Sequence, residues 1–266
     1  ALNGASFGGI IGIPALVAAV DWVGLAPALL AGSAVMAIVL VPMTVAWVGR
    51  PSSVSAAGVR SGKTAASPRN GAPPRADWTR RLALHSIAFW TVTAPFALVL
   101  LAQVGFLVHQ IAFLEPKTGR ALAGVAVAGT AIAAVLGRIG LGVVIDRLDR
   151  RLVSAACFLL QAAALFVLTK AESTAVLLAS CGVFGLSVGN VITLPALIIQ
   201  SEFDATAFAM LVGLSTAIGQ FAYAFGPGLL GLLRDLSGGY EAPLLVCISL
   251  ETAAAGIVVL RGHRTR

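Results

Sequence analysis

The chain of 266 residues is too apolar for an ordinary soluble protein, because 58% of its residues are hydrophobic and 11% are charged, against roughly 25% charged in soluble domains. Its mean hydropathy of +0.95 agrees. The formal net charge of +7 does not indicate nucleic acid as a partner, since the basic residues stand between apolar segments and form no amphipathic face. The composition therefore predicts an integral membrane protein.

Apolar segments long enough to cross a bilayer recur along the whole chain. A bilayer core about 30 Å thick needs about 20 apolar residues in a helix. Eight segments approach or exceed that length, at residues 2–20, 25–48, 87–113, 120–145, 152–170, 174–199, 207–233 and 241–260. The predicted fold class is all-α, a polytopic membrane protein with about eight transmembrane helices. The sequence opens directly on apolar residues without an initiator Met, so we expect further helices upstream.

The region 49–86 is the one clear break in composition. Residues 50–81 are rich in Ser, Ala, Gly, Pro and Arg and show no apolar period, which predicts a flexible loop. Residues 57–64 resemble a phosphate-binding loop, but Ala57 stands where that motif begins with glycine, and no predicted strand precedes it. We therefore do not expect nucleotide binding.

Lys and Arg residues are divided unevenly between the two sides of the predicted membrane. Residues 49–86 hold seven, residues 147–151 hold three and the C-terminus holds three, 13 in all. The loops on the other side hold four, at Lys117, Arg120, Lys170 and Arg234. Because basic residues concentrate in cytoplasmic loops, we predict cytoplasmic termini in a bacterial plasma (inner) membrane.

Nothing in the sequence predicts an enzyme, a metal site or a cofactor. The three cysteines, Cys157, Cys181 and Cys247, lie in apolar sequence without the spacing of a disulfide or a metal site. Gly185-Leu-Ser-Val-Gly189 matches a serine-nucleophile elbow in form, but it lies inside a predicted membrane helix. Two glycines four residues apart let helices approach closely, so we interpret this motif as a packing site.

The stretch Gly142-x-x-x-Asp146-Arg147-x-x-Arg150-Arg151 resembles the cytoplasmic loop signature of the major facilitator superfamily, in the copy between the eighth and ninth helices. In this register the chain corresponds to the family's helices five to twelve, with four N-terminal helices expected outside it. The three parts would be the last two helices of the N-terminal bundle (1–48), the central cytoplasmic loop (49–86) and the C-terminal six-helix bundle (87–266). The resemblance implies secondary transport by alternating access.

In that family the loop acts in gating, which implies a gating role for Gly142, Asp146, Arg147 and Arg151. Physically, Gly142 would permit close helix contact, Asp146 would accept hydrogen bonds from a helix N-terminus or an Arg, and the arginines would pair across the cytoplasmic interface. Asp149 stands where the usual pattern has glycine. The alternative is that these charges only set the topology.

Arg138 lies in an apolar run, eight residues before Asp146, or about 12 Å deeper along a helix. A charge at such a depth normally faces a cavity or a partner, and the planar guanidinium suits a carboxylate. The stretch resembles the eighth helix of monocarboxylate and oxalate/formate-type porters, in which an arginine binds the substrate. Ala134, however, replaces an acid found in some of them. The alternative is an arginine paired with Asp146 or with carbonyls at a helix C-terminus.

Other polar residues inside the spans complete the predicted substrate-binding set, namely His109, Gln110, Asn190, Gln220 and Tyr223. Each could instead be an interhelical hydrogen-bond partner. His109 could also couple protons, whereas Glu251, the one acid well inside a span, is expected in a buried pair or protonated.

The sequence thus predicts a transporter, symporter or antiporter, of a small organic anion, a carboxylate. The expected partners are the lipid bilayer, the small-molecule substrate and a proton or counter-ion. The alternatives are proton-coupled efflux of a hydrophobic compound and a truncated membrane interaction protein that transports nothing.

Overall fold

The computed structural model describes residues 19–20, 22–47 and 78–260. The chain divides into two units, residues 1–76 and 77–266, and each is described here by itself. Most of the predicted span 2–20, most of the loop 49–86 with its phosphate-loop-like stretch, and the end of the C-terminus lie outside the described residues.

Every element in the described ranges is helical, which confirms the all-α class. Seven helical segments among these residues are long and apolar enough to cross a membrane, and they match seven of the eight predicted spans. They are Leu25–Thr44, Ile87–Thr118, Arg120–Arg147, Arg150–Lys170, Thr174–Glu202, Phe208–Ser237 and Glu241–Val259. The chain is a polytopic integral membrane protein.

The first unit contains α3, Leu25–Trp47. Gly24, at φ 86°, precedes this helix, a conformation that glycine adopts without steric cost. Nearly all described side chains of α3 are exposed and apolar. A helix that is apolar on all sides suits a lipid environment, so this exposure agrees with a membrane span.

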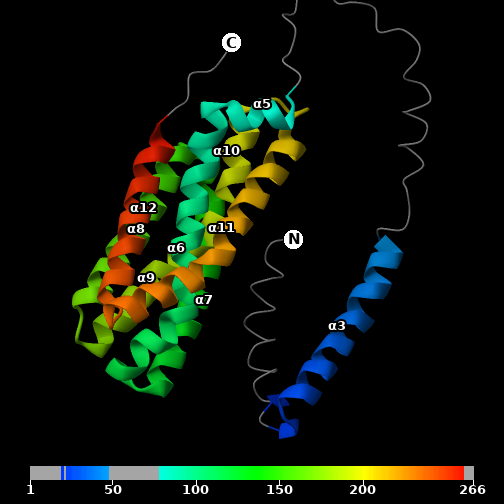
Figure 1. Ribbon diagram of the computed structural model, residues 1–266. Helices are drawn as coiled ribbons and strands as arrows, with labels where there is room; N and C mark the ends of the chain where they lie inside the picture. The colour runs from blue at the N-terminus through cyan, green and yellow to red at the C-terminus, as the bar shows by residue number, and fades with distance from the viewer. Residues whose placement is uncertain (1–18, 21, 48–77, 261–266) are drawn as a thin grey trace, which may run out of the picture. The chain divides into compact units, whose positions relative to one another are not determined.

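The second unit is a bundle of antiparallel helices (Figure 1). Its elements are α5 (Arg80–His85), α6 (Ile87–Thr118), α7 (Arg120–Val144), the short 3-10 helix η2 (Ile145–Arg147), α8 (Arg150–Lys170), α9 (Thr174–Val191), α10 (Leu194–Glu202), α11 (Phe208–Ser237) and α12 (Glu241–Val259). Tight connections reverse the chain, with Gly119 (φ 80°) after α6 and Gly238 (φ 71°) after α11.

Four of these helices, α6, α8, α9 and α12, carry most of the buried residues, whereas α7 and α11 are largely uncovered. α7 packs along α9, and α11 packs along α6. Aromatic pairs fill the centre in edge-to-face geometry: Phe96 meets Phe158 with ring centroids 5.1 Å apart, and Phe106 meets Phe184 at 4.9 Å. α7 and α11 therefore offer the surfaces from which polar side chains can reach beyond the bundle.

The predicted span 174–199 is not one continuous helix. It consists of α9 and α10, separated at Ile192 and Thr193, with Pro195 in the first turn of α10. Proline has no backbone N–H and cannot donate to the carbonyl four residues earlier, so the helix breaks where the sequence predicted continuity.

The last residues of the predicted loop 49–86 form the short helix α5. The Thr79 side chain caps it by accepting a hydrogen bond from the Leu82 N–H at 3.2 Å, and Ala83 is fully buried. Residues 80–85 are therefore ordered helix rather than flexible loop.

Candidate functional site

α7 and α9 cross with their backbones in contact at glycines. A Cβ added to Gly137 would overlap the Leu186 carbonyl, and one added to Gly189 would overlap the Ala134 carbonyl. Gly185 likewise meets the backbone of Thr130. This confirms the packing role predicted for Gly185 and Gly189, and it places the serine between them inside a continuous helix rather than at a nucleophile elbow.

Arg138 lies at this crossing and is half-buried. Its Nε donates a hydrogen bond to the Gly189 carbonyl oxygen at 3.0 Å. In an unbroken helix that oxygen would accept from the Thr193 N–H, but Thr193 donates to the Asn190 carbonyl instead. The break before Pro195 thus releases a carbonyl, and Arg138 takes the place of the missing donor.

Asn190 makes the reciprocal contact across the same crossing. Its side-chain amide donates to the Leu186 carbonyl at 3.2 Å and to the Gly137 carbonyl at 3.5 Å. Arg138 and Asn190, two predicted substrate-binding residues far apart in sequence, are therefore brought together at the α7–α9 crossing. The contact of Arg138 is of the carbonyl-bound kind that the sequence left open as an alternative.

Gln110 links three helices in the buried centre. Its Nε2 donates to the Thr130 Oγ1 at 2.9 Å, and that hydroxyl lies 2.9 Å from the Ala126 carbonyl and 3.2 Å from the Cys181 carbonyl. This geometry is that of interhelical hydrogen bonding.

His109 lies near the end of α6 opposite to α5 and has a partner for each ring nitrogen. Nε2 lies 3.1 Å from the Pro227 carbonyl and Nδ1 lies 3.1 Å from the Tyr240 hydroxyl. Because a carbonyl can only accept, Nε2 carries the hydrogen and Nδ1 accepts from the tyrosine. The side chain thus ties α6 to α11 and to the start of α12.

Gln220 and Tyr223 lie on an exposed part of α11, where Tyr223 is 41% exposed. The opposite side of the helix packs on α6, because a Cβ at Gly226 would overlap the Leu101 carbonyl. The predicted set is therefore divided among the α7–α9 crossing, the bundle centre, the end near Tyr240 and the open side of α11.

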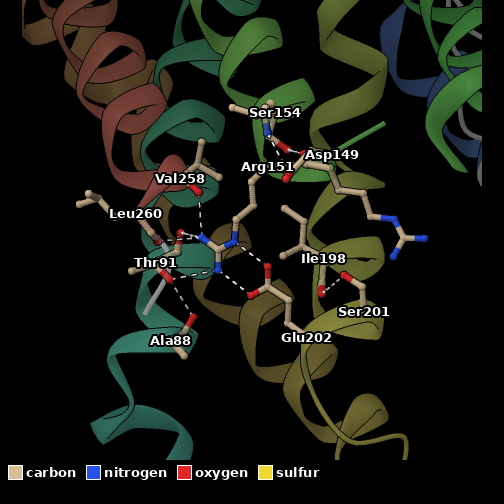
Figure 2. Close-up of polar contacts among 12 residues, drawn as sticks. Ala88, Thr91, Asp149, Arg151, Ser154, Ile198, Ser201, Glu202, Val258 and Leu260 are labelled. Carbon is tan, nitrogen blue, oxygen red and sulfur yellow. Dashed lines mark hydrogen bonds and ion pairs between the residues drawn. The ribbon is translucent and has the colours of Figure 1, made fainter. Parts of the chain in front are cut away.

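Arg151 forms a buried cluster of polar contacts that joins four helices (Figure 2). Its Nε and Nη2 donate to the two carboxylate oxygens of Glu202 at 2.7 and 2.8 Å. Its Nη1 donates to the carbonyls of Val258 and Leu260 at 2.8 and 3.0 Å, and its Nη2 to the Thr91 hydroxyl at 3.2 Å. Arg151 is 2% exposed, so its guanidinium is shielded from water, whereas the Glu202 side chain is 26% exposed.

The local sequence explains how Arg151 is held. Asp149 caps α8 by accepting from the N–H groups of Arg151 and Leu152 at 2.9 and 3.3 Å, which fixes the first turn. α12 ends at Val259, so its last carbonyls lack N–H donors from a following turn. Arg151 donates hydrogen bonds in their place. Glu202 and Thr91 were not predicted as partners of Arg151, since only tertiary structure brings them to this point.

The other predicted gating residues lie at the surface of the same end. Asp146 is exposed and lies 4.0 Å from Arg150 Nη2, while Arg147 is exposed in η2. A Cβ at Gly142 would meet no atom of the described residues within 4 Å. The close helix contact predicted for Gly142 is therefore absent from this part of the chain, because Gly142 lies on the exposed side of α7.

Glu251 is fully buried in α12. Neither of its carboxylate oxygens has a hydrogen-bond partner among the residues that the structure describes, and no described cation forms an ion pair with it. The buried pair considered for this acid is therefore not found there.

No family model matches the chain. The chain is 36% identical over 110 residues to a protein of Thauera aromatica that bears the name of a proposed anionic 4-hydroxy-benzoate permease. The alignment covers 41% of this chain and 66% of that protein, just short of two thirds of its length. The similarity is to a protein named for transport, and it leaves membership of the major facilitator superfamily unassigned.

Proposed function

We propose that this chain is part of a major-facilitator-type secondary transporter that carries a small organic anion, a carboxylate, by alternating access. Seven apolar spans and the similarity to a protein named as an anion permease support a transporter. The observation that carries the proposal is Arg138, a cation in the apolar span of α7 whose Nε is fixed to the Gly189 carbonyl.

The contact of Nε supports a substrate site beside Arg138. It holds the guanidinium at the α7–α9 crossing, where Gly137 and Gly189 allow no side chain to intervene. A planar guanidinium presents hydrogen-bond donors along more than one edge. A substrate carboxylate binds near the Arg138 guanidinium, with Asn190 beside it on α9. Gln220 and Tyr223 contribute from α11, and Gln110 and His109 hold α6 in place.

The Arg151 cluster makes one end of the bundle a rigid block. It connects α6, α8, α10 and the end of α12 through one side chain. Gly142, Asp146 and Arg147 lie exposed beside this block, where an opposing helix bundle can contact them. Arg151 therefore stiffens the cytoplasmic gate. The three exposed residues form the surface that contacts the opposing bundle when this gate is closed.

The orientation follows from charge. We place the Arg151 end in the cytoplasm of a bacterial plasma membrane, because the basic residues concentrate in the loops at that end. A proton or counter-ion would couple transport to a gradient.

Proton-coupled efflux of a hydrophobic compound is the second candidate. Phe221 and Phe225 are exposed on α11 with ring centroids 5.0 Å apart. An aromatic lining of this kind suits an apolar substrate, whose binding would not depend on Arg138.

The experiment is equilibrium binding of 4-hydroxybenzoate to the transporter that contains this chain, with Arg138→Lys and Arg138→Gln as variants. A hydrogen bond to a charged group contributes about 1.5 to 3 kcal/mol, so Kd should rise on the order of tenfold to a hundredfold in Arg138→Gln. Arg138→Lys should recover part of the affinity, because it keeps the charge without the planar fork.

Arg120→Gln is the matched control, since Arg120 begins the same helix at its opposite end and is exposed. Its Kd should stay at the wild-type value. Unchanged 4-hydroxybenzoate binding in Arg138→Gln would contradict an anion site at Arg138 and would favour efflux of a hydrophobic compound.

A further inference from the structure

The helix α5 lies across the end of the bundle rather than along it (Figure 1). Ser86, in an extended conformation at φ −86° and ψ 122°, turns the chain between α5 and α6. Because α6 begins at Ile87 as an apolar span, α5 is at the depth where the apolar core of a bilayer gives way to headgroups. A short helix at this depth, running along the membrane surface, is an interfacial element.

One side of α5 is fixed to the bundle. Ala83 is fully buried, and the indole Nε1 of Trp90 donates to the Leu84 carbonyl at 2.7 Å. Immediately before the helix, the ring of Trp78 packs edge-to-face on Phe203 at 5.2 Å between centroids. These contacts hold α5 against α6 and the segment after α10, so its remaining surface faces outward in a defined direction.

The outward surface combines apolar side chains with cations. Leu82, Leu84 and Ile87 are exposed, Ile87 by 74%, and Arg80 and Arg81 are exposed beside them. No acidic residue lies in α5. A soluble anion would not require the apolar side chains, whereas a lipid surface offers both acyl chains and negative charge.

A hollow on α5 brings together hydrogen-bond donors suited to a phosphate. It has a volume of about 340 Å³ and is lined by Thr79, Arg81, Leu82 and His85. The Thr79 Oγ1 accepts from the Leu82 N–H, so its own hydrogen can be donated outward. The His85 Nδ1 lies 2.8 Å from the Arg81 backbone carbonyl, and this contact orients the ring.

The sequence before α5 adds charge of the same sign. Residues 49–86 hold seven Lys and Arg residues and one acid, Asp77. Basic clusters of four to eight residues beside a transmembrane helix are attracted to anionic lipid surfaces. We propose that α5 is a binding site for an anionic phospholipid, whose phosphodiester lies in the hollow at Arg81 while Leu82 contacts the upper acyl chains.

The test is lipid retention by the purified 266-residue chain, measured by native mass spectrometry after detergent exchange in equimolar phosphatidylglycerol and phosphatidylcholine. Wild type should retain phosphatidylglycerol preferentially. Each cation near a lipid surface contributes about 1 kcal/mol, so Arg80→Gln with Arg81→Gln should lower the apparent affinity about thirtyfold. Arg120→Gln, which removes an exposed arginine at the other end of the bundle, should retain the wild-type preference.

Three outcomes would overturn the proposal: equal retention of the two lipids by wild type, the same loss in Arg120→Gln, or displacement of the lipid by millimolar glycerol 3-phosphate, which would indicate a soluble-anion site. A second measurement does not depend on the folding of the double variant. A spin label at Leu84→Cys, with the native cysteines replaced by Ala, should report the depth of the headgroup–acyl boundary in phosphatidylglycerol vesicles. A label in bulk water would contradict the proposal.

Discussion

The two arginines Arg138 and Arg151 differ in how deeply the bundle buries them. Arg151 is 2% exposed and spans four helices, with a bidentate carboxylate and the terminal carbonyls of α12 as its partners. Arg138 is half-buried, and its Nε binds one carbonyl at a helix break. The first belongs to the architecture of the bundle, whereas the second lies on α7, a helix that the unit leaves largely uncovered.

An arginine in an apolar span can therefore serve either the packing of the bundle or the function of the protein. Tertiary structure brings Glu202, from a distant helix, to Arg151. This contact places a predicted gating residue at the centre of an interhelical cluster. Substitutions should therefore act differently on residues that hold the bundle together and on residues at its open surfaces.

The largest effect should follow from removing one half of the buried pair. Arg151→Gln or Glu202→Gln leaves the other group without its partner, which typically costs about 3 to 5 kcal/mol. We expect a matching fall in the free energy of unfolding, measured by denaturant titration in detergent micelles.

Arg147→Gln is the control, because Arg147 is exposed in η2 at the same end. Surface substitutions usually change stability by less than about 0.5 kcal/mol. The double variant Arg151→Met with Glu202→Gln should recover part of the loss, since neither charge then remains buried alone. Equal stability of Arg151→Gln and Arg147→Gln would show that the Arg151 cluster does not stabilise the bundle.

Replacing a glycine by alanine should change the stability less, and the change should differ between glycines at the helix crossing and those on the open side of α7. In Gly189→Ala the new methyl group meets the Ala134 carbonyl, and overpacking of this kind costs about 1 to 3 kcal/mol. Gly142→Ala meets open space and should be neutral or stabilising by up to about 1 kcal/mol, because Ala favours helix more than Gly does. Thermal unfolding of both variants measures the contrast, and equal destabilisation would contradict the crossing described here.

The smallest effect should come from the hydrogen bond between Gln110 and Thr130. Hydrogen bonds between membrane helices contribute about 0.6 kcal/mol on average and at most about 1.7. Thr130→Val removes the hydroxyl that Gln110 contacts at 2.9 Å while nearly keeping the shape, and it should lower stability within that range. Loss of substrate binding at unchanged stability would instead place Gln110 in the substrate path.

Much of the fold was predictable because length and hydropathy alone define membrane spans. The seven described spans follow from the bilayer's thickness, and the packing role of Gly185 and Gly189 follows from their spacing. No described residue of another helix lies within 4 Å of a Cβ built on Gly142, so the close contact predicted for Gly142 stays a prediction. The break at Pro195 was missed, because proline is tolerated inside many membrane helices.

The site was less predictable than the fold. Arg138 stood out by its charge, but its contact with Gly189 requires a carbonyl released by a helix break on another helix. Glu202 carried no local signal that pointed to Arg151, and α5 is too short for a periodic pattern. Asp149 was the exception, since an Asp directly before a helix is a capping signal that could have located the start of α8.

The most direct test of the anion site is a comparison of 4-hydroxybenzoate with its uncharged analogue 4-hydroxybenzamide, in wild type and in Arg138→Gln. If Arg138 binds the carboxylate, wild type should prefer the acid by on the order of tenfold or more. That preference should largely disappear in Arg138→Gln. Comparing two ligands in two proteins isolates the contact between the carboxylate and the Arg138 side chain. The same preference for the acid in both proteins would contradict the account.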